Sequence, residues 1–91
     1  MVPKFSLGQV VATPGALEAL ERAGKTPAAV LRRHVHGDWG DVCGDDRQQN
    51  DLALAEGGRL FSSYTTLRGG TIWVITEADR SATTILLPDE Y

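Results

Sequence analysis

The spacing of hydrophobic residues predicts a first strand followed directly by a helix. Residues 5–12 contain aromatic and β-branched residues and predict the strand. The pair Thr13-Pro14 then predicts a helix start, because threonine can cap the free N–H groups and proline at the first helical position has none to lose. Apolar residues three apart give this helix one buried stripe, and Gly24 predicts its end.

A second and a third helix follow, each with its own start signal. Another Thr-Pro pair opens residues 26–37, which end at a glycine and predict a short helix. Residues 38–44 hold two glycines and predict a tight loop. Asp45 then predicts the N-cap of a third helix, with Gln48 completing a capping box. This helix is expected to end near residue 56, before a pair of glycines.

The last third of the chain has the alternating pattern of β-strands. Residues 59–67, 71–76 and 82–87 predict three strands, joined by turns at 68–70 and 77–80. The middle strand, TIWVIT, carries apolar residues on both faces. Such a strand is typical of the centre of a sheet, or of a sheet covered on both sides.

The element order β-α-α-α-β-β-β predicts the α+β class. We expect an antiparallel sheet of three strands, joined by the first strand as a fourth, with the short helices packed on one face. The 91 residues predict a single domain spanning 1–91. A chain of this size buries only roughly 60–65% of its unfolded surface, so its core is thin, and a homodimer that adds buried surface would suit it.

The charge of the chain is unevenly distributed, although the total is small. Nine basic and twelve acidic residues give a net charge of −3, which indicates no particular partner. Residues 22–33 contain four basic residues and no acid, whereas residues 38–56 contain six acids and one base. One interpretation is a basic helical face that binds nucleic acid, formed by Arg22, Lys25, Arg32, Arg33 and Arg68.

Composition and hydropathy favour a cytoplasmic protein. Cys43 is the single cysteine, so no internal disulfide can form. No apolar run approaches the roughly 18 residues of a membrane span. The beginning of the sequence also lacks the charged and apolar regions of a signal peptide. We therefore expect the protein to work in a reducing cytosol without a membrane partner.

His34, His36 and Asp38 are the residues that come nearest to a metal-ligand cluster. Histidines two apart on a helix point about 200° away from each other, so we predict no metal and no cofactor. Cys43 could act as a nucleophile beside one of these histidines, which leaves a small metal- or Cys/His-dependent hydrolase as an alternative. The aspartates between residues 38 and 46 lack the spacing of a calcium-binding EF-hand loop.

A loop tryptophan and a charged turn are the candidates for partner binding. Trp39 lies in the predicted loop GDWGD, and aromatic residues are enriched at binding hot spots. The alternative is that its ring folds back and fills the core, as large rings in small domains commonly do. The charged turn at 77–80 ends in an arginine that can present its guanidinium to a partner. The predicted contact residues for a protein partner are Trp39, Asp38, Asp41, Glu77, Asp79 and Arg80.

Three segments together resemble a family of small plasmid-related proteins. They are LGQVVATPGALEAL at residues 7–20, GDWGDV at 37–42 and IWVITEADRSATTILLPDEY at 72–91. Members occur on plasmids, integrated elements and bacterial chromosomes, and some carry the label of a type I restriction enzyme M subunit. The resemblance implies a mobile-element origin. Adenine methylation itself would need a Rossmann-like domain and an Asn-Pro-Pro-aromatic loop, and the chain has neither the length nor a Pro-Pro pair.

The leading prediction is a non-enzymatic binding protein of mobile-element origin. The chain has no phosphate-binding loop and no G-x-S-x-G motif, and no catalytic residue is assigned. We expect it to dock on a protein partner, such as a component of host defence or plasmid maintenance. The alternatives are a nucleic-acid-binding accessory protein and the small hydrolase described above.

Overall fold

The computed structural model describes residues 2–68 and 70–91 of the chain, and its elements follow the predicted order. The predicted turn at 68–70 includes Gly69, which lies outside the described residues. The elements are β1 Gln9–Ala12, α1 Pro14–Arg22, α2 Pro27–Val35, α3 Gly44–Glu56, β2 Leu60–Thr66, β3 Gly70–Thr76, β4 Ala82–Leu86 and the 3₁₀ helix η1 Pro88–Glu90.

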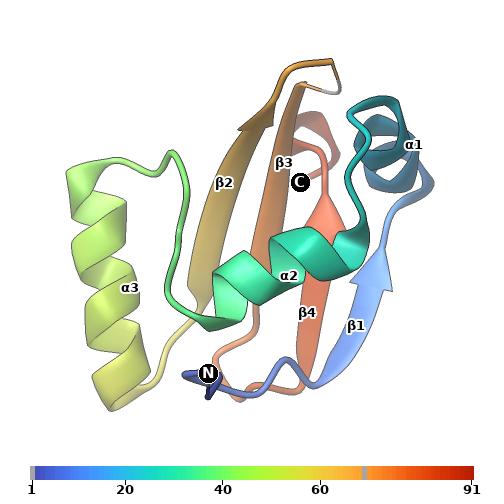
Figure 1. Cartoon of the computed structure of the whole chain (residues 1–91). Helices are drawn as coiled ribbons and strands as arrows, with labels where there is room; N and C mark the ends of the chain where they lie inside the picture. Colours follow the sequence, from blue (N-terminus) through green and yellow to red (C-terminus); the bar gives the residue numbers. More distant parts are fainter. Residues whose placement is uncertain (1, 69) are drawn as a thin grey trace.

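The four strands form one sheet in the order β1-β4-β3-β2 (Figure 1). Strands β2, β3 and β4 form the predicted antiparallel meander. Strand β1, in contrast, pairs with β4 in parallel, so the sheet is mixed and the expectation of an antiparallel sheet is wrong for this pair. The long crossover between the two strands, which contains all three α-helices, lets the chain return to β1 in the same direction.

Strand β1 is also shorter than the predicted strand 5–12. Gly8 has a φ of +63°, and a Cβ at this position would collide with the backbone oxygens of Arg80 and Ser81. The chain therefore turns sharply against the β3–β4 connection just before β1. Only a residue without a side chain fits this approach, and pairing with β4 begins at Gln9.

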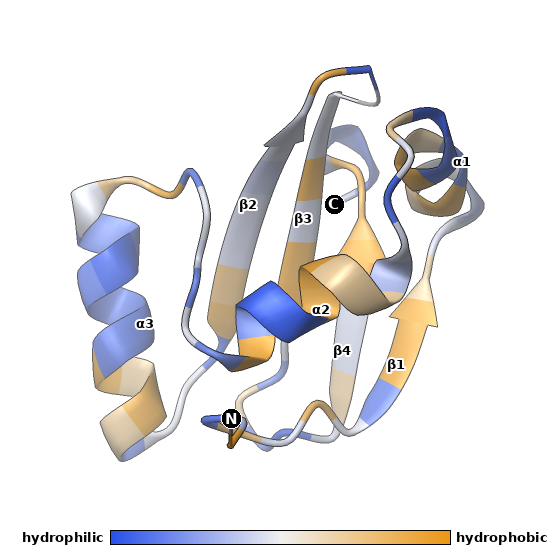
Figure 2. Cartoon of the chain, in the orientation of Figure 1, coloured by the Kyte–Doolittle hydropathy of each residue, from blue (hydrophilic) through white to orange (hydrophobic). Residues whose placement is uncertain are grey.

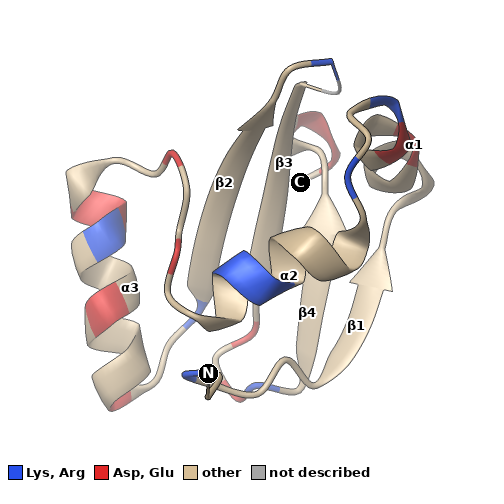
Figure 3. Cartoon of the chain, in the orientation of Figure 1, with Lys and Arg blue, Asp and Glu red and all other residues tan. Residues whose placement is uncertain are grey.

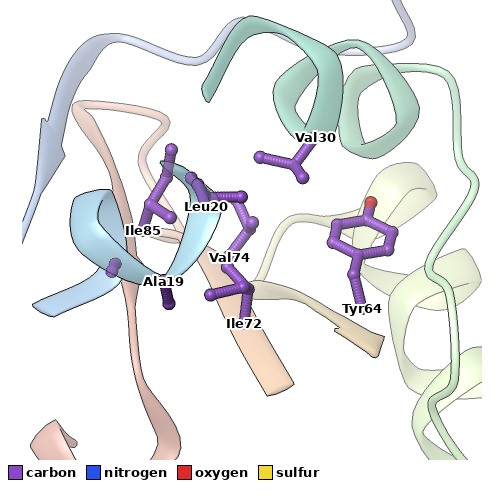
Figure 4. Packing of buried hydrophobic residues seen from close by; sticks show 8 residues of the cluster. Ala19, Leu20, Val30, Tyr64, Ile72, Val74 and Ile85 are labelled. Atoms are coloured by element: carbon purple, nitrogen blue, oxygen red, sulfur yellow. The ribbon is translucent and has the colours of Figure 1, made fainter. Parts of the chain in front are cut away.

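Helices α1 and α2 lie on one face of the sheet and bury the main hydrophobic core against it (Figure 1). The strands carry no charged residue, and the charges are on helices and connections (Figure 3). Strands β3 and β4 contribute aliphatic side chains to the core, and β2 contributes a tyrosine (Figure 4). The buried cluster is Ala16, Ala19, Leu20, Val30, Tyr64, Ile72, Val74 and Ile85.

The two Thr-Pro helix starts are confirmed, and the third start is not. The hydroxyls of Thr13 and Thr26 each accept a hydrogen bond from the backbone N–H three residues later. Helix α3 instead has Cys43 at its N-cap, without a side-chain hydrogen bond to the helix. The predicted capping box of Asp45 and Gln48 is therefore wrong, because Asp45 already lies in the first helical turn.

Helix α3 lies beside β2, and a buried amide is one of the contacts that hold it there. Figure 2 shows α3 as largely hydrophilic, so an apolar stripe alone does not attach it. Asn50, only 2% exposed, donates from Nδ2 to the backbone oxygen of Phe61 at 2.7 Å and accepts from its N–H at 3.0 Å. The side chain thus satisfies both outward backbone groups of this edge residue.

The loop between α2 and α3 closes the rest of the β2 edge. Gly40 forms a parallel bridge with Ser63, whose N–H donates to the oxygen of Trp39 at 3.0 Å. The Asp41 N–H donates to the Ser63 oxygen at 2.6 Å, and the Asp41 carboxylate accepts from the N–H of Thr65 at 3.0 Å. Gly40 has a φ of +74°, and a Cβ there would collide with β2, so the approach requires glycine.

Replacing Asn50 with alanine is expected to lower the free energy of unfolding by about 2 kcal/mol, because two backbone groups of Phe61 lose their partner. Urea unfolding followed by circular dichroism measures the change. The exposed neighbour Gln49 provides the control, and Gln49→Ala should stay within about 0.5 kcal/mol of the wild type. Equal unfolding midpoints for both variants would contradict the role of Asn50.

Candidate functional site

Trp39, predicted as an exposed contact residue, is a core side chain. Its exposed fraction is 1%. The indole stacks on Phe5 with 6.2 Å between ring centroids and meets His34 edge-on at 5.6 Å. Its N–H lies 3.4 Å from a carboxylate oxygen of Asp51. The expectation that Trp39 is presented to a partner is therefore wrong: the loop is at the surface, and the ring points inward.

Asp38 and Asp41 are exposed, but both carboxylates are engaged within the loop and its surroundings. Arg33 donates to both oxygens of Asp38, at 2.7 and 3.3 Å. This hydrogen bond lowers the pKa of Asp38 below its usual value. Asp41 binds the β2 edge, as described above. The structure thus gives both aspartates a part in holding the loop.

Arg80 joins the β3–β4 turn to the end of α3. Its backbone has a φ of +62°, and its guanidinium donates to the backbone oxygens of Gly58 at 2.6 Å and Ala53 at 3.1 Å. Two further bonds go to oxygens of its own turn. Both terminal nitrogens of the guanidinium that was predicted to face a partner therefore donate within the chain. Glu77 and Asp79, from the same turn, are exposed.

The basic residues of the nucleic-acid alternative are partly neutralised by neighbouring acids. Arg22 pairs with Glu18 at 3.2 Å, and Arg33 pairs with Asp38 at 2.7 Å. The Arg33 guanidinium also lies 4.4 Å from the centroid of the Tyr64 ring. The remaining predicted residues, which are exposed on separate elements, are Lys25, Arg32 and Arg68.

The residues of the hydrolase alternative are engaged separately. His36 donates from Nδ1 to the backbone oxygen of Arg32 at 2.7 Å. The exposed Cys43 thiol lies 3.4 Å from a carboxylate oxygen of Asp46. Across residues 2–68 and 70–91, no group of three or more His, Cys, Asp or Glu side chains converges as metal ligands would. The segment that most suggested a metal site thus holds together by other contacts.

His34 is fully buried at the centre of a chain of hydrogen bonds. Thr83 donates its single hydroxyl proton to the oxygen of Leu7 at 2.8 Å, so it accepts from Thr76 at 2.7 Å. Thr76 then accepts from Nε2 of His34 at 2.9 Å, and Nδ1 accepts from the Ser62 hydroxyl at 2.6 Å. The proton count assigns His34 as the neutral tautomer with its hydrogen on Nε2.

The open face of the sheet, opposite α1 and α2, carries a second set of apolar side chains. Strand register aligns one side chain from each of β2, β3 and β4 in every row across this face. Adjacent rows are Phe61, Ile75, Thr84 and Ser63, Trp73, Leu86. Trp73 is half-buried and meets the ring of Phe61 edge-on, with 5.0 Å between centroids.

Two adjoining hollows make this face a continuous groove. One is lined by Arg59, Phe61, Trp73, Ile75 and Tyr91, and it encloses about 240 Å³. The other has a similar volume and shares Arg59, Ile75 and Tyr91. The hydroxyl of Tyr91 accepts from Arg59 at 3.0 Å, and its ring meets Trp73 at 5.9 Å. We refer to these two hollows together as the aromatic groove.

The aromatic groove is lined by two carboxylates and one cation. Glu77 and Glu90 line its second hollow. Arg59, the cation lining both hollows, is already hydrogen-bonded to Tyr91 and lies 3.9 Å from the carboxylate of Glu77. A hydrogen bond from the Thr13 hydroxyl lowers the pKa of Glu90, which keeps this carboxyl ionised at neutral pH.

The aromatic groove was not predicted, although one signal in the sequence points to it. The strand TIWVIT is apolar on both faces, which was interpreted as a central strand or a doubly covered one. It is central, but the helices cover only the face of Ile72 and Val74. Helices on one side of the sheet cover only one face of this strand. Because the strand is apolar on both faces, its other apolar face must lie uncovered.

No known protein family, curated protein or solved structure matches this chain. The resemblance to plasmid-related proteins thus rests on the three sequence segments alone. Within the described parts of the chain, no helix has the length and apolar character needed to cross a membrane.

Acid is expected to destabilise the protein through His34. Burial, with a smaller effect of Arg80, lowers the pKa of His34 from 6.5 to about 4. Between pH 6.5 and pH 4, the imidazole of His34 binds a proton in the unfolded chain but not in the folded chain. The free energy of unfolding is therefore highest well above pH 6.5 and decreases as the pH is lowered. The loss should reach about 2–3 kcal/mol at pH 4.5.

Urea unfolding at pH 7.5, 5.5 and 4.5 measures this loss, and an NMR titration of the imidazole signals locates the pKa directly. His36→Gln removes the half-buried histidine and should keep the same dependence. A stability that does not change between pH 7.5 and 4.5 would rule out a buried neutral His34.

Proposed function

We propose that this chain is a non-enzymatic binding protein that docks a segment of a protein partner in the aromatic groove. The observation that carries the proposal is an apolar sheet face, hollowed and lined by aromatic rings, that α1 and α2 leave uncovered. Soluble domains seldom expose such a patch unless it serves recognition. Binding sites are commonly concave and mostly apolar, with a few polar groups at defined positions.

The charge pattern selects the chemistry of the docked segment. Carboxylates of Glu77 and Glu90 flank the apolar floor, and Arg59 pairs with Glu77 and donates to Tyr91. The charged side chains that line the groove therefore carry one more negative than positive charge. A segment with an apolar side chain next to lysine or arginine complements this arrangement. A polyanion such as a nucleic acid strand would meet two carboxylates instead, so the groove favours a basic, apolar peptide.

Trp73 is the side chain expected to contribute most to binding. It is half-buried between Phe61 and Tyr91, so its ring is held in place while part of it faces the groove. Tryptophan combines a large apolar area with a face that attracts cations, and it is the residue most enriched at hot spots. Of the contact residues predicted from sequence, Glu77 is the one that lines the groove, and the proposal includes it.

A partner from host defence or plasmid maintenance remains part of this proposal. It rests on the resemblance of the segments 7–20, 37–42 and 72–91 to plasmid-related proteins. The chemistry of the groove adds one requirement, which is that the partner presents an accessible basic and apolar segment.

Selection from a display library of random peptides is expected to enrich sequences with lysine or arginine beside a large apolar residue. Binding of an enriched peptide is then followed by NMR, because the chain has two indole N–H signals. The signal of Trp73 should shift on binding. The signal of Trp39, which is buried and lies within hydrogen-bonding distance of Asp51, is an internal control and should stay in place.

Variants test the same site by affinity. Trp73→Ala should weaken peptide binding by roughly 30-fold or more, as for a hot-spot residue. The exposed Tyr91 gives a second variant with little risk to folding, and Tyr91→Ala should weaken binding by about tenfold. Leu67→Ala, at an exposed apolar position outside the groove, is the matched control.

Two outcomes would overturn the proposal. One is that no peptide enriched in basic and apolar residues binds the folded protein. The other is that a single-stranded oligonucleotide, and not the peptide, shifts the Trp73 signal with a steep dependence on salt, which would make the face a nucleic-acid platform.

A further inference from the structure

The two edge strands of the sheet differ in whether other parts of the chain hydrogen-bond to their outward backbone groups. Strands β2 and β1 lie at opposite ends of the sheet (Figure 1). The outward backbone groups of β2 are occupied by Asn50, by the loop that follows α2 and by Asp41. Edge strands left open are templates for pairing with another strand. The backbone groups at the outer edge of β1 therefore decide whether the sheet can pair with another strand.

Alternation along β1 identifies the groups that face outward. The N–H of Gln9 donates to the oxygen of Ser81 and the N–H of Thr13 to that of Ile85, both on the β4 side. Because successive residues of a strand point their backbone groups to opposite sides, those of Val10 and Ala12 face away from the sheet. Among residues 2–68 and 70–91, none of the hydrogen bonds outside the paired strands engages these outward groups.

Strand β1 also lacks the usual protection of an edge. Its sequence QVVA has no charge and no proline, and it pairs with β4 without a bulge. Val10 and Val11 are 43% and 44% exposed, on opposite faces of the sheet. Lysine, proline and bulges are the features that commonly prevent edge-to-edge pairing. This edge therefore presents free backbone groups together with two apolar side chains.

We propose that β1 is the interface of a homodimer, in which β1 of one copy pairs antiparallel with β1 of a second copy around a two-fold axis. The strand is uncharged, so two copies approach without like-charge repulsion. The β2 edge is closed, so the assembly stops at two copies, as a two-fold interface requires. The two sheets become one continuous sheet of eight strands.

Of the registers that a two-fold axis allows, one pairs all the outward groups of Val10 and Ala12, and we take this register. A two-fold axis perpendicular to the sheet keeps the helices of both copies on the same side, so facing residues must share a face. The hydrogen-bonded pairs are then Val10 of one copy with Ala12 of the other, twice. Between them, Val11 faces Val11 of the second copy as a pair without hydrogen bonds, where side chains come closest. Both aromatic grooves lie on the same side of this dimer.

A single four-residue strand on each side makes a small interface, so the dimer is expected to dissociate on dilution. Sedimentation over a wide range of protein concentration should show the mass rise from that of the 9.8 kDa chain to twice this value. In the dimer, the amides of Val10 and Ala12 should also gain protection from hydrogen exchange.

Charge substitutions at the two-fold axis test the register. Val11→Lys and Val11→Glu each place like charges opposite each other and should sediment as monomers where the wild type is dimeric. An equal mixture of the two variants brings opposite charges together and should recover the dimer. Val11→Thr, which keeps a β-branched side chain, is the matched control and should still dimerise. Val10→Pro removes an outward donor without losing a bond to β4, and it should also be monomeric.

The Trp39 indole signal reports whether each variant is folded, because this ring is buried in the core. A wild type that stays monomeric at every concentration overturns the proposal, as does a Val11→Lys variant that remains dimeric. A third outcome is that the protein stays monomeric and the amides of Val10 and Ala12 gain protection only when an extended peptide is added. Strand β1 would then be a docking site for a strand of another protein, and the homodimer would be ruled out.

Discussion

The chain of buried hydrogen bonds through His34 is the constraint on which the fold depends. It connects the segment before β1, three strands and α2, and all its side chains are fully buried. Buried polar groups destabilise a core unless each finds a partner, so any shift of register in β2, β3 or β4 would leave a hydroxyl or imidazole unsatisfied. The chain of bonds thus specifies one pairing of the strands, beyond what apolar burial alone requires.

The helix layer is one-sided because α1 and α2 both bury their apolar side chains in the same cluster. Helices α1 and α2 have nine residues each, and together they cover only the side of the sheet that carries Val74 and Ile85. Helix α3 is polar and lies beside β2, so it does not close the second face. On that face, aromatic rings that meet edge-on partly shield the strands, and they leave a groove between them.

Local signals predicted the elements well, and long-range pairing could not be predicted from them. The Thr-Pro pairs at 13–14 and 26–27 act through hydrogen bonds within a few residues, so both starts were predicted correctly. The parallel pairing of β1 depends on a crossover through most of the chain, which no local pattern encodes. Trp39 was correctly predicted to lie in a loop. The direction of its ring, however, is set by packing against Phe5 and His34, and neither contact follows from the sequence around Trp39.

The arrangement of the sheet separates two kinds of recognition. A face recognises side chains, because rows of residues such as Trp73 stand perpendicular to the strands. An edge recognises backbone, because its free N–H and C=O groups pair with any strand in register. The chain closes the edge at β2 with the GDWGD loop and Asn50, and it leaves β1 and the aromatic face open. Pairing at β1 leaves the groove accessible, so the two surfaces can be occupied at the same time.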